Sequence, residues 1–204
     1  VLVFLAVLVL MDSFKLVPLR AVVRLILAGA AAAFVGARLH AGILEAGLVS
    51  GTVLSRYVAP VTEESLKALP VVWLLFRRRV GFLVDAAILG FAVGTGFALV
   101  ENVEYLRALG ASSVFLWVVR GFGTAVLHGG TTSILAVVAR GLEEQRPGAG
   151  LAVVLPGLAA AVAIHSLFNH FILPPVLTTI LLFVTLPVLL VAVFSRSEKG
   201  TREW

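Results

Sequence analysis

Glu63 and Glu64 are adjacent acids at the start of a long apolar run, PVTEESLKALPVVWLLF, and Lys67 follows them. Glu63 and Lys67 stand four positions apart, a spacing that places two side chains on the same face of a helix. An ionised side chain at the centre of a membrane helix costs roughly 2.5–3.5 kcal/mol on insertion scales, so each such charge needs a reason. One reason is catalysis, because a glutamate in an apolar setting can act as a general base toward water.

Three other apolar runs carry polar side chains that could join these acids. Glu101 and Tyr105 lie in GTGFALVENVEYL, His128 lies in GFGTAVLHGGTTS, and His165 and Asn169 lie in AVAIHSLFNHF. Glu101 and Tyr105 are four apart, as are His165 and Asn169, so each pair shares a helix face. We therefore expect four helices to turn these residues toward one common site.

These side chains support three kinds of chemistry. The sequence has no cysteine, which excludes thiolate catalysis and zinc–thiolate sites. A glutamate could activate water while a neighbouring histidine or asparagine donates hydrogen bonds to the oxyanion. Two histidines and a glutamate form a known zinc ligand set, which His128, His165 and Glu101 could supply, although no HExxH motif is present. The same acids could instead carry protons or cations in a transporter.

The composition is that of an integral membrane protein. Of the 204 residues, 60% are hydrophobic and 13% are charged, and the mean hydropathy is +1.09. Soluble domains have about 25% charged residues. No polar stretch is long enough to fold separately, so we expect one integral domain over 1–204, with the motifs in a core at about 54–172. The net charge of +5 does not indicate nucleic-acid binding, because the basic residues stand at the ends of apolar runs.

The apolar runs predict an all-α, polytopic bundle of about seven transmembrane helices. Their expected limits are 1–12, 21–39, 54–76, 81–106, 113–139, 150–172 and 175–195. The first run lacks a basic start and a small-residue cleavage site, so we expect a spanning helix there rather than a signal peptide.

The distribution of Lys and Arg predicts the orientation of the bundle. With the N-terminus outside and the C-terminus cytoplasmic, eleven of the 16 basic residues, among them Arg77, Arg78 and Arg79, fall on the cytoplasmic side. The polar residues of the four helices then lie at similar depth, nearer the outer face. We expect the chain in the cytoplasmic membrane of a prokaryote.

Each of these polar residues also has a structural explanation. A single buried histidine or asparagine is often a hydrogen-bonding partner between membrane helices. Glu63 and Lys67 could form an ion pair near the interface, and His40, Glu104 and His170 are expected in rim, loop or packing roles. The shared depth of acids and imidazoles on four helices nevertheless favours a common functional site.

Four motifs, in this order, resemble those of the PrsW family of intramembrane proteases. Its EExxK motif is similar to EESLK, its FxxxE motif to FALVENVEY, and its two histidine motifs to HGGTT and HSLFN. The last also resembles the HxxxN motif of the wider CAAX-protease and bacteriocin-processing superfamily. The resemblance covers roughly residues 60–170.

The resemblance implies a polytopic protease that cleaves a membrane-protein or membrane-anchored peptide substrate near or within the lipid bilayer. It implies that Glu63, with Glu64 beside it, activates water, and either of the two acids could be the base. It also implies that His165 and Asn169 stabilise the oxyanion and that His128 is a further member of the site.

Glu101 stands where CAAX-type relatives have a histidine, so it would assist the water or bind a metal ion such as zinc. Lys67 and Tyr105 are expected to contact these residues and hold them in position. The mechanism is therefore either glutamic or metal-dependent.

Two other classes of function remain open from the sequence. An ion-coupled transporter would be expected to contain internal repeats, but the double glutamate has no counterpart three or four helices later. A non-catalytic membrane scaffold could also retain the polar cluster.

Overall fold

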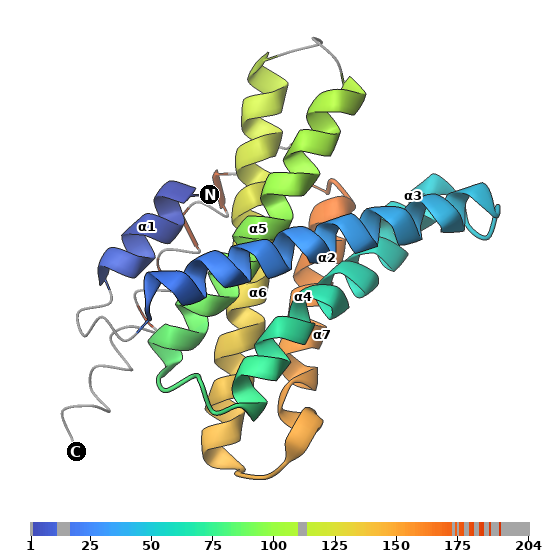
Figure 1. Cartoon of the computed structure of the whole chain (residues 1–204). Coiled ribbons are helices and arrows are strands. Elements are labelled where there is room, and N and C mark those ends of the chain that lie inside the picture. The colour runs from blue at the N-terminus through green and yellow to red at the C-terminus, as the bar shows by residue number, and fades with distance from the viewer. Residues whose placement is uncertain are drawn as a thin grey trace.

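The computed structural model describes residues 2–11, 17–109, 114–172 and 174, with scattered positions between 176 and 192. These residues form helices and connecting turns, and they contain no strand, so the predicted all-α fold is confirmed (Figure 1). The elements are α1 (Leu2–Met11), α2 (Leu19–Glu45), α3 (Gly51–Val53), a π-helical segment (Leu54–Val58), α4 (Ala59–Phe76), α5 (Leu83–Leu109), α6 (Val114–Gln145), a 3-10 turn (Gly150–Val153) and α7 (Leu155–Asn169).

Four helical segments of the described chain are long and apolar enough to cross a membrane. They are Leu19–Glu45, Leu83–Arg107, Phe122–Gln145 and Gly150–Asn169, and they correspond to four of the seven predicted spans. The predicted span 54–76 forms the π-helical segment and α4, and α4 differs from these four in carrying three buried charged residues, Glu63, Glu64 and Lys67. The predicted span 1–12 contains α1, of which residues 2–11 are described. Most of the predicted span 175–195 lies outside the described residues.

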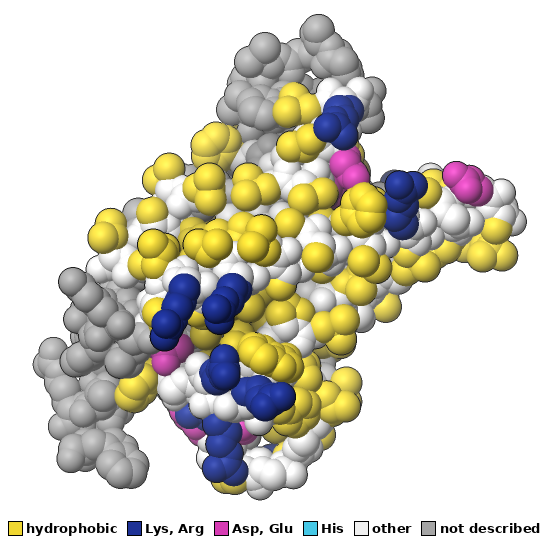
Figure 2. Space-filling model, in the orientation of Figure 1, with side chains coloured by type: hydrophobic (Ala, Val, Ile, Leu, Met, Phe, Trp, Pro, Cys, Tyr) yellow, Lys and Arg dark blue, Asp and Glu magenta, His cyan; other side chains and the backbone are white. Residues whose placement is uncertain are grey.

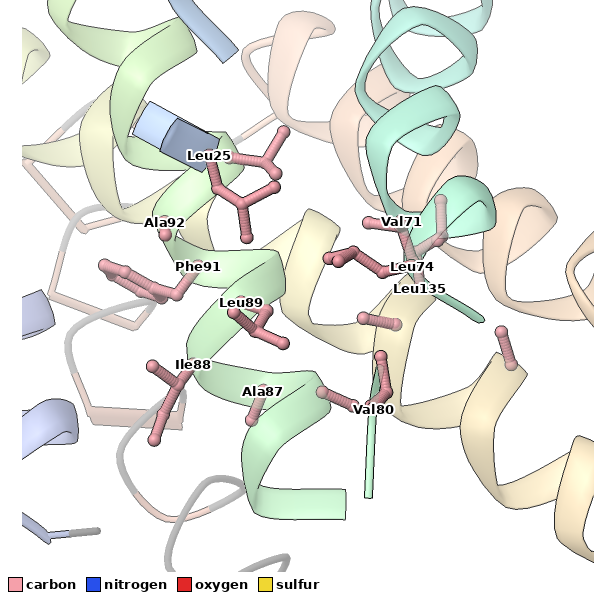
Figure 3. Packing of buried hydrophobic residues seen from close by; sticks show 14 of the residues in the cluster. Leu25, Val71, Leu74, Val80, Ala87, Ile88, Leu89, Phe91, Ala92 and Leu135 are labelled. Carbon is pink, nitrogen blue, oxygen red and sulfur yellow. The ribbon is translucent and has the colours of Figure 1, made fainter. Parts of the chain in front are cut away.

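The centre of the bundle is α5, in which every residue from 85 to 98 is buried. A helix that is apolar on all sides is expected to be enclosed by its neighbours, and α5 packs against α2 and α6. Figure 3 shows the hydrophobic cluster that α5 forms with the flanking helices, including Leu25, Val71, Leu74, Ile88, Phe91 and Leu135.

Glycines set how closely α2 crosses α5. A Cβ atom on Gly29 would collide with the backbone of Val93, and one on Gly96 would collide with the backbone of Ile26. Only glycine therefore allows the two backbones to touch at this crossing. Figure 1 shows α2 crossing α5 at a steep angle. The C-terminal half of α2 therefore lies beside α4 and the polar residues of that helix.

The surface of α2 that faces away from the bundle is apolar. Leu27, Phe34 and Val35 are exposed by 64%, 56% and 51%. Figure 2 shows hydrophobic side chains over much of this face of the molecule. Such a continuous apolar surface is unfavourable in water and suits contact with lipid chains.

Candidate active site

A buried ion pair on α4 forms the base of the site. Lys67 and Glu64 have no exposed side-chain surface, and the Lys67 ammonium donates to Glu64 Oε1 over 2.7 Å. The sequence prediction paired Lys67 with Glu63, four positions away, and this pairing is wrong in the structure. Positions three and four apart both face the same side of a helix, and Glu64 is the acid that points into the bundle beside Lys67.

Lys67 also connects α4 to α6 and α5 through His128. The Lys67 ammonium lies 2.9 Å from Nδ1 of His128, whose Nε2 lies 2.6 Å from Glu101 Oε2. An ammonium group can only donate, so Nδ1 of the neutral imidazole accepts and Nε2 donates its proton to Glu101. Glu64, Lys67, His128 and Glu101 thus form one hydrogen-bonded chain across three helices.

His165 on α7 completes the contacts of Glu64. Its Nδ1 lies 2.8 Å from Glu64 Oε1, and the Thr131 hydroxyl donates to the same oxygen over 3.2 Å. Glu64 Oε1 therefore accepts from Lys67, His165 and Thr131, which leaves this oxygen fully used in holding α4, α6 and α7 together.

Glu63 has different surroundings from Glu64. Its side chain is 10% exposed, and its Oε2 has no hydrogen-bond partner within the described chain. Two imidazoles lie close to its carboxylate: Nε2 of His165 is 3.8 Å from Oε2, and Nδ1 of His40 is 3.8 Å from Oε1. Glu64 Oε2 also lacks a partner within the described chain, so Glu63 differs from Glu64 in its partial exposure and in the two imidazoles near its carboxylate.

A pocket of about 420 Å³ opens onto Glu63. Glu101, Glu104, Tyr105, His40 and Asn169 also line it, and its apolar wall includes residues of α2 that are spaced by four, Ala33, Ala37 and Ala41. The fully buried Glu64, Lys67 and His128 are not among its lining residues. The site therefore has a front layer that faces the pocket and a buried layer that supports it.

Glycines on α5 let α6 approach closely, which sets the position of His128 relative to the other site residues. A Cβ atom on Gly94 would collide with the His128 carbonyl, and one on Gly90 would lie 2.6 Å from the carbonyl oxygen of Thr132. The backbones of α5 and α6 are therefore in contact at the HGGTT motif, and Ser133 adds a hydrogen bond of 2.9 Å to the Ala87 carbonyl. Thr132, four residues after His128, donates to the backbone carbonyl of His128 over 2.9 Å.

Asn169 has a hydrogen-bond partner that the sequence did not indicate. It lines the pocket, but its amide nitrogen, the group expected to stabilise an oxyanion, donates to the carbonyl of Ser55 over 2.8 Å. In the π-helical segment, Ala59 N–H bonds to the Leu54 carbonyl instead of that of Ser55. Asn169 therefore satisfies a carbonyl that the irregular helix leaves without its usual partner.

The neighbouring carbonyl of Arg56 is satisfied in the same way. Its usual partner in an α-helix would be the amide of residue 60, but Pro60 has no N–H. The Ser166 hydroxyl donates to this carbonyl over 2.7 Å. Asn169 and Ser166 of α7 thus both donate to backbone carbonyls of the irregular segment that precedes Glu63.

Sequence reasoning missed two contributors to the site. His40, expected in a rim or packing role, lines the pocket and lies 2.7 Å from the Thr62 hydroxyl through Nε2. Thr131 was not singled out, although it stands three residues after His128 in the HGGTT motif. The sequence carries no signal for His40, because its contact with α4 depends on how α2 crosses the bundle.

One group of the described residues could hold a metal ion: Glu63, His128 and His165, whose ligand atoms lie within 4.8 Å of one another. We predicted Glu101 as the carboxylate ligand, but in this group the carboxylate is that of Glu63. Glu101 instead contacts His128, in the way that a carboxylate orients a metal-bound imidazole. Ligand atoms in a tetrahedral zinc site are about 3.4 Å apart, so the group needs only a modest contraction. The donor set fits zinc, provided that the Lys67 ammonium gives up Nδ1 of His128.

Comparison with known proteins identifies the family of the chain. A family model described as PrsW family intramembrane metalloprotease matches residues 17–194. No curated protein and no solved structure matches the chain. The matched region contains all four motifs, both layers of the site and the four apolar helices. The chain therefore belongs to the PrsW family of intramembrane metalloproteases and is an integral membrane protein.

Proposed function

We propose that this protein hydrolyses a peptide bond of a membrane-associated protein with a water molecule that Glu63 activates. The observation that carries the proposal is that Glu63 lines the pocket, whereas the neighbouring acid, Glu64, is fully buried and is not among the lining residues. A general base must lie within hydrogen-bonding reach of the proton that it removes, and Glu63 can reach a water molecule in that pocket.

Glu64 is less suited to this role. Its side chain has no exposed surface, and Oε1 already accepts from Lys67, His165 and Thr131. Glu64 instead fixes the positions of Lys67 and His165, and a negative charge there is balanced by the ammonium 2.7 Å away. The adjacent acids therefore have separate tasks, with Glu63 in the reaction and Glu64 in its support.

The remaining polar groups of the pocket can complete the reaction. As the water oxygen bonds to the substrate carbonyl carbon, its proton passes to Glu63 and the carbonyl oxygen becomes an oxyanion. Because the Nδ1 proton of His165 is used by Glu64, the proposed donor to this oxyanion is Nε2 of His165 in its imidazolium form, and Tyr105 lines the pocket as a second donor. Collapse of the tetrahedral intermediate breaks the C–N bond, and the proton on Glu63 goes to the leaving amine.

Asn169 has an indirect role in this scheme. Because its amide nitrogen bonds to Ser55, it holds α7 against the helix that carries Glu63. Glu101 keeps the proton of His128 on Nε2 and fixes the ring.

Glu63, His128 and His165 would be the ligands of a metal ion at this site. When bound, the ion would supply a Lewis acid that polarises a carbonyl or a water molecule. In that version Glu101 orients the His128 ligand, and the pocket and its lining residues bind the same substrate.

The arginines at one end of the bundle indicate the orientation. Arg20 and Arg24 lie in the first turns of α2, and Arg77, Arg78 and Arg79 follow α4. By the positive-inside rule, we propose that this end lies in the cytoplasm. The pocket at Glu63 then lies toward the outer leaflet of a prokaryotic cytoplasmic membrane, where it would receive a membrane-protein or membrane-anchored substrate.

The test is cleavage of fluorogenic transmembrane peptides by the purified full chain in liposomes. Glu63→Gln removes the base without changing the shape of the side chain, and we expect turnover to fall by about 10²–10⁴-fold. Glu104→Gln is the matched control, because Glu104 is an exposed acid that lines the same pocket. Cleavage that survives Glu63→Gln at the rate of the control would rule out the proposed mechanism.

A further inference from the structure

A second pocket, of about 360 Å³, lies between the start of α2, the end of α4 and the start of α5. Arg20, Arg24 and Arg79 line it together with the apolar side chains of Leu25, Leu74 and Leu89. We call this the basic pocket. Along α2, Arg24 and His40 are 16 residues apart, or about 24 Å at 1.5 Å per residue, so the basic pocket is remote from Glu63.

The charge of the basic pocket comes from separate parts of the chain. Arg20 and Arg24 stand one helical turn apart on α2, and Arg79 follows α4. All three side chains are exposed, and Figure 2 shows Lys and Arg side chains grouped over the region where α2 begins and α4 ends. Asp85 is the acid among the lining residues, and its Oδ2 accepts from the backbone N–H groups of Gly81 and Phe82.

The walls of the basic pocket change from polar to apolar with depth. Leu25, Leu74 and Leu89 are among the buried core residues, whereas the arginines are exposed. Trp73 is 49% exposed, and the Arg79 guanidinium lies 5.3 Å from the centre of its ring. Tryptophan beside arginine is typical of the level at which lipid headgroups meet hydrocarbon.

We propose that the basic pocket binds an anionic phospholipid, with the phosphate between the arginines and the adjoining glycerol and acyl chain on the leucine floor. Guanidinium groups recognise phosphate through paired hydrogen bonds. Basic pockets between membrane helices are suited to lipid headgroups. An inorganic phosphate ion would use the arginines but leave the apolar floor without a function, so the combination favours a lipid.

The chain supplies its own control for general electrostatic attraction. Arg77 and Arg78 adjoin Arg79, are exposed, and are not among the residues that line the basic pocket. They carry the same charge at the same end of the bundle. Changing them alters the net charge of this face as much as changing two arginines of the pocket does.

The experiment measures lipid binding to the purified full chain by native mass spectrometry, with thermal unfolding in parallel. The probes are dioleoyl phosphatidylglycerol, dioleoyl phosphatidylcholine and inorganic phosphate. The variants are Arg24→Gln with Arg79→Gln, and the control Arg77→Gln with Arg78→Gln. We expect phosphatidylglycerol to bind the protein and its control variant tightly, and the pocket variant about 30-fold more weakly, from roughly a fivefold factor per arginine.

Three results would overturn the proposal. Equal losses in the two double variants would mean diffuse attraction to a basic face. Equal binding of phosphatidylcholine would remove the requirement for an anionic headgroup. Competition by inorganic phosphate at the concentration at which the lipid binds would identify a site for soluble phosphate. Thermal unfolding confirms that the pocket variant remains folded, and peptide cleavage is not needed for any of these readings.

Discussion

The amide nitrogen of Asn169 donates a hydrogen bond to the backbone carbonyl of Ser55, 2.8 Å away. Four residues earlier on the same helix, His165 contacts Glu64 over 2.8 Å. One end of α7 thus binds both the irregular backbone before α4 and the buried acid within it. The HxxxN spacing serves in this structure to join two helices, which leads to the first prediction.

Asn169→Ala should affect stability more than chemistry. Loss of one hydrogen bond costs about 1 kcal/mol, so the melting temperature should fall by a few degrees and turnover should fall only modestly. Ser166→Ala, which removes the corresponding bond to Arg56, should behave alike. A drop in turnover of about 10²–10³-fold for Asn169→Ala alone would instead make Asn169 a direct donor to the oxyanion.

Lys67→Met should be among the most destabilising single changes in the chain. It leaves the Glu64 carboxylate and the His128 ring without their shared donor in a fully buried position. Breaking one side of a buried ion pair costs about 3–5 kcal/mol, which thermal unfolding in detergent would detect. Combining Lys67→Met with Glu64→Gln should be less harmful than the sum of the two single changes. If the two single losses in stability simply add in the double variant, Lys67 and Glu64 do not stabilise each other.

Gly94→Ala should displace α6 and with it His128. The added methyl group would overlap the His128 carbonyl, so we expect a loss of about 1–3 kcal/mol in stability together with a loss of turnover. Gly42→Ala is the matched control, because Gly42 is also helical but a Cβ atom there would meet none of the described atoms within 4 Å. That change should stabilise the helix by about 0.5–1 kcal/mol. Equal effects of the two changes would refute the close contact of α5 with α6.

Metal content should distinguish a ligand from its supporting residue. If zinc binds, Glu63→Ala removes a ligand and should abolish stoichiometric zinc, measured by elemental analysis of the purified protein. Glu101→Ala removes only the partner of His128 and should weaken zinc binding by about 10–100-fold. If Glu101→Ala abolishes zinc and Glu63→Ala only weakens its binding, Glu101 is the ligand. Retention of full zinc in both variants would place the metal elsewhere.

Hydropathy and motif spacing were enough to predict an all-α membrane protein and the family to which it belongs. The depth argument also predicted that acids and imidazoles of four helices would meet, since burying a charge in hydrocarbon is unfavourable unless another polar group contacts it. The structure brings these residues together: Glu63, Glu64, Glu101, His128 and His165. The number of spans was harder to predict, because α4 carries three buried charged residues and so does not resemble an ordinary apolar span.

The sequence by itself determined which side chains could meet, and the tertiary structure decided which of them do. Helical periodicity places positions three and four apart on one face, so it could not choose between Glu63 and Glu64 as the partner of Lys67. That choice followed from His165 and Thr131, which approach Glu64 from other helices. Likewise, the role of Asn169 depends on a carbonyl that only the π-helical segment frees. Contacts between helices depend on crossing geometry, which no local spacing encodes.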